Sequence, residues 1–100
     1  MYHVKFYDDV FYDLDKLPDD IATEAKEYFY KYEKDPYKYS QKLYNQGEFN
    51  LEGYRKTYLA DASYRIVLKI ENNIAKIVEV VAVGKRENME VYKEAFNRIK

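Results

Sequence analysis

Residues 74–83 read IAKIVEVVAV, a strongly β-branched and apolar run that Gly84 follows. Isoleucine and valine favour an extended backbone because their branched side chains pack well on the pleated surface of a sheet. The run is long and apolar enough to be the central strand of a sheet. It therefore decides the fold class, and the rest of the chain is interpreted outward from it.

Shorter strand patterns lie on its N-terminal side. Residues 54–59 and 64–70 have strand composition, and Asp-Ala-Ser at 61–63 suits a tight turn between them. Two consecutive asparagines at 72–73 are a hairpin signal. Residues 2–7 alternate and are rich in aromatic and β-branched side chains, which indicates one more strand. We expect a three-stranded C-terminal meander joined by an N-terminal strand.

Helical spacing appears in three places. Residues 8–17 and 18–35 form a predicted helical hairpin, in which a proline suits the start of the second helix. Residues 88–99 predict an amphipathic C-terminal helix, and 37–53 a connection that holds a short helical turn. We therefore expect a single α+β domain over 1–100, with an antiparallel sheet and all helices on one face.

Composition excludes several classes of chemistry. The chain has no cysteine, so it has no disulfide, thiol nucleophile or thiolate metal site. Its single imidazole, His3, lies on a predicted strand and is expected to be an ordinary surface residue. We expect no metal and no cofactor. No apolar segment approaches the roughly 20 residues of a membrane span. We expect no secretory leader, and therefore a cytoplasmic protein without a membrane partner.

Charge is distributed unevenly along the chain. The net charge is −1, but residues 1–50 carry 7 lysines and 11 acids, whereas 51–100 carry 10 lysines and arginines and 7 acids. All four arginines lie in the second half, and arginine is the better residue for bidentate contact with phosphate. The asymmetry indicates an interaction surface, although a random fluctuation over such small numbers explains it equally well.

Basic residues and one tyrosine suggest a site in the second half. Lys56 and Arg65 lie on adjacent predicted strands, Arg86 follows the central strand, and Tyr92 begins the last helix. If the sheet brings them together, nearby cations lower the pKa of the phenol. Such a group suits attack of an RNA 2′-hydroxyl on the adjacent phosphate, which needs proton transfer and positive charge. Solvated surface charges remain the alternative.

Three stretches together resemble a known family. They are 63–70 (SYRIVLKI), 83–87 (VGKRE) and 90–95 (EVYKEA). As a set they resemble the RelE/ParE superfamily of type II toxin–antitoxin toxins, on the RelE-like branch. The motifs cover 53–99, while over 1–52 the resemblance rests on the order of elements.

The resemblance implies a compact fold like that of microbial ribonucleases and a metal-independent endoribonuclease that cleaves mRNA in the ribosomal A site. By position, it implies that Lys56 and Arg65 hold the phosphate. The resemblance further implies that Arg86 stabilises the transition state and that Tyr92 stacks on or activates the attacking nucleotide. A cognate antitoxin, the ribosome and mRNA are the implied partners. Further contacts to RNA or the ribosome are expected from Arg55, Lys69 and Lys85.

Two features depart from the family pattern. Tyr58 stands where RelE-type toxins often have a second lysine, and the sequence pI is about 5.9, whereas these toxins are usually strongly basic. Two other functions therefore stay open. One is a ParE-like poison of DNA gyrase, and the other is a catalytically inactive, toxin-like module that binds an antitoxin.

Overall fold

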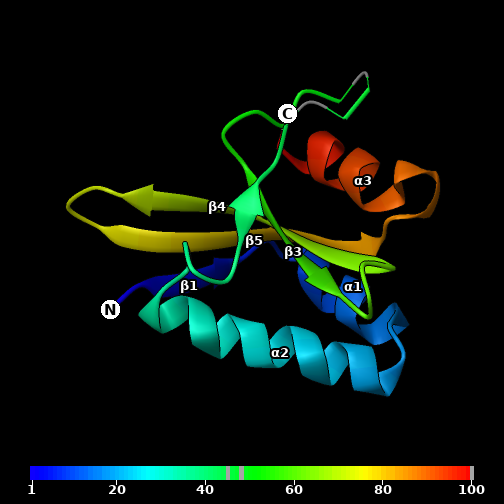
Figure 1. Ribbon diagram of the computed structural model, residues 1–100, viewed down its shortest axis with the longest axis horizontal. Coiled ribbons are helices and arrows are strands. Elements are labelled where there is room, and N and C mark those ends of the chain that lie inside the picture. Colours follow the sequence, from blue (N-terminus) through cyan, green and yellow to red (C-terminus); the bar gives the residue numbers. More distant parts are fainter. Residues whose placement is uncertain (45, 48, 100) are drawn as a thin grey trace.

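The computed structural model describes residues 1–44, 46–47 and 49–99. A mixed sheet crosses the molecule, with strands in the order β1-β5-β4-β3-β2, and helices lie on both of its sides (Figure 1). This confirms the expected α+β class. Along the chain the elements are β1 (His3–Phe6), α1 (Asp9–Lys16), α2 (Asp19–Lys34), β2 (Gln41–Lys42), β3 (Arg55–Leu59), β4 (Tyr64–Asn72), β5 (Lys76–Lys85), the 3-10 turn η1 (Glu87–Met89) and α3 (Glu90–Arg98).

The β-branched run lies at the centre of the sheet, as expected. β5 pairs with β4 on one side and with β1 on the other. A bulge interrupts the pairing with β4, because Val67 is opposite Ala82 while the next residue, Leu68, is opposite Val80. The extra residue, Val81, turns towards the same core as its neighbour Ala82. The bulge thus lets β5 present two consecutive apolar side chains to one face.

β1 departs from the expected antiparallel arrangement. It pairs with β5 in parallel, with Val4 opposite Val78 and Phe6 opposite Val80. The other strand pairs are antiparallel, as expected for a meander. A parallel pair needs a long crossover, and here α1, α2 and the strands β2 to β4 supply it. Strand composition alone does not specify this direction, which depends on where the long connection returns.

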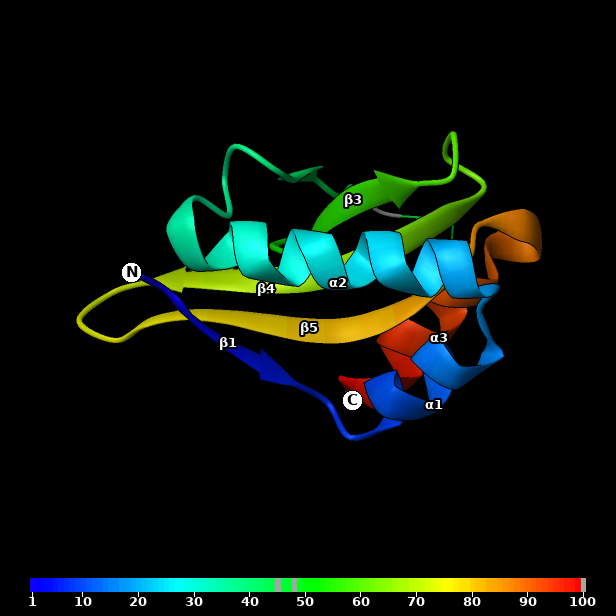
Figure 2. The same cartoon turned by 90° about the horizontal axis from the view of Figure 1, so that it is seen from below.

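The expectation that all helices share one face is wrong. α2 lies below the sheet and α3 above it, and Figure 2 shows α2 in front of the strands with α3 behind them. The reason is that the central strands are apolar on both sides. Ile66 and Leu68 belong to the core between the sheet and α2, whereas the intervening Val67 belongs to the core between the sheet and α3. Each face requires its own helical cover.

α1 runs beside β5 and is tied to α3 by a buried ion pair. Arg98 donates to both carboxylate oxygens of Asp13, at 2.6 and 2.8 Å, and also to the carbonyl oxygen of Val81 at 2.9 Å. Asp13 in turn accepts the backbone N–H of Val83 at 3.0 Å. These bonds fix the C-terminal end of α3 against the central strand.

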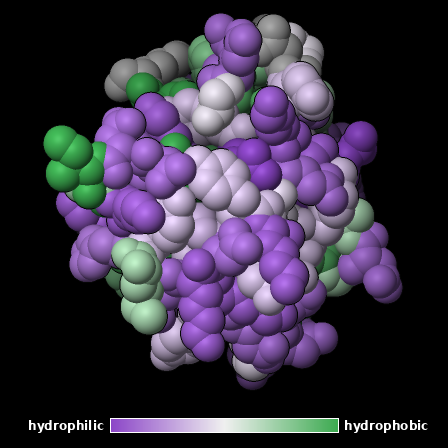
Figure 3. All heavy atoms as spheres, turned by 60° about the vertical axis from the view of Figure 1, so that its left-hand side comes forward, coloured by the Kyte–Doolittle hydropathy of each residue, from purple (hydrophilic) through white to green (hydrophobic). Residues whose placement is uncertain are grey.

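Smaller differences concern the connections. The 37–53 segment contains the two-residue strand β2, which is too short to produce a periodic pattern. Asn72 is opposite Lys76, so the loop between β4 and β5 has three residues. Ile74 in this loop is fully exposed. Figure 3, which brings this side forward, shows a mainly hydrophilic surface on which apolar residues form separate spots. Among the described residues, no helix is long and apolar enough to cross a membrane.

Candidate active site

The two sides of β3 have different chemical character. Thr57 and Leu59 are buried, with Leu59 in the core beneath α2, whereas Lys56 and Tyr58 alternate with them on the opposite face. Antiparallel pairing places Arg65 of β4 directly across from Tyr58. The alternation of β3 and its register with β4 therefore bring one lysine, one tyrosine and one arginine together. We call Lys56, Tyr58, Arg65 and Tyr92 the cationic tyrosine cluster.

Arg65 is held between two aromatic rings. Its guanidinium carbon lies 4.4 Å from the ring centroid of Tyr58 and 5.7 Å from that of Tyr92. One terminal nitrogen donates to the Tyr92 hydroxyl. The Nε atom of Arg65 is buried without a hydrogen-bond partner in the described part of the chain. The geometry restrains a permanent positive charge beside two phenols.

Tyr92 reaches this arginine from inside the protein. It lies on α3 with only 1% of its surface exposed, in the core beneath that helix. Asn88 and Met89, with φ of 54° and 57°, turn the chain sharply before the helix begins. Val91 then packs over Gly84, and this contact holds the start of the helix against β5. The structure thus brings Arg65 and Tyr92 together, as the sequence suggested.

Tyr58 is the exposed phenol of the cluster, with 37% of its surface accessible. A hydrogen bond from Lys56 lowers the pKa of Tyr58 below its usual value of 10, and the positive charges of Lys56 and Arg65 lower it further. Partial burial opposes this shift. The sequence motifs indicate Tyr92 as the phenol among cations, and Tyr58 stands out in them only as a departure from the family. The i, i+2 spacing of Lys56 and Tyr58 on a strand is the signal that places them on one face.

Arg86 lies one residue beyond the end of β5. Arg65 is opposite Gly84, two residues earlier, and the backbone N–H of Arg86 donates to the carbonyl oxygen of Ser63 at 3.0 Å. Its exposed side chain makes no hydrogen bond or ion pair with any residue that the structure describes. Lys85 alternates with Gly84 and is opposite Tyr64. Both basic residues line an open hollow of about 420 Å³ at this end of the sheet.

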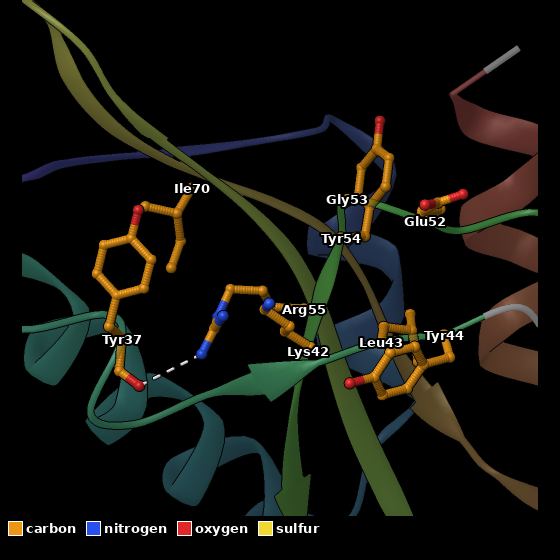
Figure 4. Close-up of a pocket in the computed structure, with 9 residues that line it drawn as sticks. All are labelled: Tyr37, Lys42, Leu43, Tyr44, Glu52, Gly53, Tyr54, Arg55 and Ile70. Atoms are coloured by element: carbon orange, nitrogen blue, oxygen red, sulfur yellow. Dashed lines mark hydrogen bonds between the residues drawn. The ribbon is translucent and has the colours of Figure 1, made fainter.

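The remaining predicted RNA contacts lie apart from the cluster. Arg55 is directed towards Tyr37, as Figure 4 shows, and donates to the side chain and carbonyl of Ser40 at 2.7 and 2.8 Å. In the same view the ring of its neighbour Tyr54 points away from Arg55. The Lys69 Nζ atom lies 5.6 Å from the centroid of the Tyr54 ring. These tyrosines and Arg55 line a groove of about 730 Å³. Lys69 shares the strand face of Arg65, whereas Arg55 is engaged on the α2 side.

Metal ligands are a separate question. Within 1–44, 46–47 and 49–99, no group of three or more His, Cys, Asp or Glu side chains is placed to hold a metal ion. His3 lies on β1, at the opposite edge of the sheet from β3.

Comparison with known proteins finds similarity only among solved structures. No protein-family model and no curated protein matches the chain. Among solved structures, the free state of an E. coli toxin RelE variant with two arginines replaced by alanine has 26% identity and a TM-score of 0.74. That match covers 99% of this chain and 98% of the other.

Two further structures agree. The isolated E. coli RelE toxin has 26% identity, a TM-score of 0.65 and complete coverage of both chains, at 100% each. A chain of the RelBE2 toxin–antitoxin complex of Mycobacterium tuberculosis has 23% identity and a TM-score of 0.69, covering 85% of this chain and 98% of that one. The resemblance inferred from the motifs is therefore confirmed, and this chain has the fold of the RelE-like toxin superfamily.

Proposed function

We propose that this protein is the toxin of a type II toxin–antitoxin system and that it cleaves mRNA in the ribosomal A site. Structural similarity to RelE toxins and RelBE complexes supports the toxin assignment. The cleavage proposal rests mainly on the cationic tyrosine cluster. In it, Arg65 is fixed between an exposed and a buried tyrosine, beside Lys56.

The reaction that fits the cluster is attack of a 2′-hydroxyl on the adjacent phosphate, with the 5′-oxygen leaving. Negative charge builds up on the phosphoryl oxygens, and preorganised cations stabilise it most effectively. Lys56 and Arg65 would bind the phosphate from the sheet. Arg86 would approach it from the end of β5 and act electrostatically, because a guanidinium keeps its protons at neutral pH and is a poor proton donor. No step in this scheme requires a metal or a cofactor.

Tyr92 is given a positioning role. Its ring is buried, so it is not available to stack on a nucleotide in this structure, but its hydroxyl holds Arg65. Loss of that hydrogen bond would free the guanidinium to rotate away from the phosphate. The wider surface proposed to contact RNA or the ribosome comprises Arg55, Lys69 and Lys85.

A cognate antitoxin is the proposed protein partner. The similar structures include an archaeal RelE–RelB complex from Pyrococcus horikoshii and an E. coli RelE variant bound to a RelB peptide. A translating ribosome is the proposed site of action, which places the activity in the cytoplasm.

The decisive experiment is primer extension on an mRNA under translation in a reconstituted system, with free mRNA as a second substrate. We expect cuts in the A-site codon that require the ribosome. Arg86→Ala should raise the barrier to cleavage by about 2–4 kcal/mol because it removes charge stabilisation. Lys76→Ala, which removes an exposed lysine at the far end of β5, is the matched control and should cleave normally.

Two outcomes would contradict the proposal. Cleavage by Arg86→Ala at the wild-type rate would remove Arg86 from the site. A folded wild-type protein that leaves translated mRNA intact would favour gyrase poisoning or an inactive antitoxin-binding module. A DNA supercoiling assay with gyrase would then separate these two alternatives.

A further inference from the structure

Two tyrosines contact Arg65, and their surroundings differ. Tyr92 is 1% exposed and its hydroxyl already accepts a hydrogen bond from Arg65. Tyr58 is 37% exposed, with its ring against the same guanidinium on the open side. A phosphate bound by Arg65 from solvent would therefore meet Tyr58 first. Only Tyr58 of this pair can touch a nucleotide without movement of α3.

The surroundings of Tyr58 favour its ionised form. Lys56 lies 5.1 Å from the ring centroid and donates a hydrogen bond to the hydroxyl, and Arg65 covers the ring from the neighbouring strand. Both cations lower the pKa of Tyr58. Across a small hollow at the outer edge of β3, the other ionisable groups near Tyr58 are Lys38, Tyr28 and Tyr39. No carboxylate lines this hollow among the described residues, so no negative charge there opposes ionisation.

Other groups of the cluster are poorly suited to accept a proton. Arg65 is permanently charged. Lys56 donates its hydrogen bond to Tyr58 and stabilises the phenolate only while it is protonated. The single imidazole, His3, lies on β1 beyond β4 and β5. These observations leave the Tyr58 oxygen as the exposed, ionisable oxygen beside the proposed phosphate site.

We propose that Tyr58 is the catalytic base of the ribonuclease reaction, an inference that rests on the function proposed above. The Tyr58 phenolate takes the proton from the 2′-hydroxyl, and the 2′-oxygen forms a bond to phosphorus. The bond from phosphorus to the 5′-oxygen breaks, and solvent water protonates the leaving oxygen. The products are a 2′,3′-cyclic phosphate and a free 5′-hydroxyl. Tyr58 then returns its proton to the hydroxide left in solvent, so atoms and charge balance.

The test is single-turnover cleavage of ribosome-bound mRNA at saturating toxin, measured over the pH range that ribosomes tolerate. At pH values below the pKa of Tyr58, the rate of cleavage by the wild type should increase about tenfold for each unit that the pH is raised, because the phenolate fraction rises with pH. Tyr58→Phe keeps the ring over Arg65 but removes the base, so cleavage should fall about 10²–10⁴-fold and lose this pH dependence. Co-sedimentation with ribosomes should not change.

Two further variants separate catalysis from packing. Tyr58→Lys supplies another titratable base at the position where RelE-type toxins often have lysine, and it should recover most of the lost rate. Tyr30→Phe removes the hydroxyl of an exposed tyrosine on α2 and should cleave like the wild type.

Each result decides the matter. Loss in Tyr58→Phe, a flat pH profile and recovery in Tyr58→Lys support the proposal. Wild-type cleavage by Tyr58→Phe overturns it and leaves the ribonuclease function standing. A loss that keeps the wild-type pH profile, or that Tyr58→Lys does not recover, assigns Tyr58 to packing and also overturns it. Absence of cleavage by the wild type overturns both proposals.

Discussion

The two faces of the sheet each bury a helix tyrosine whose hydroxyl meets a strand side chain. Beneath α2, the Tyr32 hydroxyl pairs with Thr57, which also donates to the carbonyl oxygen of Tyr39 at 2.7 Å. Beneath α3, the Tyr92 hydroxyl pairs with Arg65. Both rings are almost fully buried, at 0% and 1% exposure. The two helix side chains are alike, but the strand partner is neutral on one face and positively charged on the other.

The Tyr32–Thr57 pair is neutral and lies within the core, whereas the Tyr92–Arg65 pair includes a cation that extends towards solvent. Burial raises the pKa of Tyr32, so this hydroxyl stays protonated and bonded within the core. Arg65 instead is positively charged, and its guanidinium contacts both the buried Tyr92 hydroxyl and the exposed ring of Tyr58. Alternation along β3 separates the two networks by one residue. A neutral strand partner thus stabilises the fold, whereas a cationic one also creates a site for phosphate.

The largest effect should come from the ion pair that holds α3 over its face. Asp13 and Arg98 have side chains only 10% and 11% exposed. Asp13→Ala should leave the buried guanidinium with only its longer contacts to two exposed carboxylates, at 3.6 and 3.8 Å, and lower the free energy of unfolding by about 3–5 kcal/mol. Urea denaturation measures this. Asp9→Ala removes a carboxylate that is 61% exposed and 3.6 Å from the same arginine, and should cost less than about 1 kcal/mol. Equal costs would show that burial does not set the strength of this contact.

Next in size is the charge that distinguishes the two faces. Arg65→Ala should slow ribosome-dependent cleavage about 10²–10³-fold because a preorganised cation is lost. It should also destabilise the protein by about 1–3 kcal/mol, since the Tyr92 hydroxyl loses its partner. Single-turnover cleavage at a temperature where circular dichroism shows a folded variant separates the two effects. Normal cleavage by the folded variant would place the phosphate site elsewhere.

The smallest effects come from deleting the two buried hydroxyls. Tyr32→Phe and Tyr92→Phe should each cost about 1 kcal/mol of stability, the usual net value of one hydrogen bond. Only Tyr92→Phe should slow cleavage, and it should impair cleavage more than ribosome binding, because it frees Arg65 without removing its charge. Thermal unfolding and cleavage assays on the two variants test this contrast. A matching loss of cleavage in Tyr32→Phe would remove the distinction between the faces.

Much of this architecture follows from local sequence patterns. The run at 74–83 identified the central strand, and apolar spacing identified the three helices, because both signals depend only on neighbouring residues. The motifs around Arg65, Arg86 and Tyr92 indicated the RelE-like fold, and the structural comparisons agree. Strand alternation also places Lys56 and Tyr58 on the same face of β3, because residues two apart on a strand point the same way.

What the sequence by itself determined is the three helices, the longer strands, the fold class and the residue types available to the site. The tertiary structure alone decided the parallel pairing of β1, the position of α3 on the opposite face from α2, and the burial of Tyr92 while Tyr58 stays exposed. The physical reason is distance along the chain. Periodicity reports contacts between near neighbours, whereas the bonds from Asp13 to Arg98 and from Arg65 to Tyr92 join residues 85 and 27 positions apart.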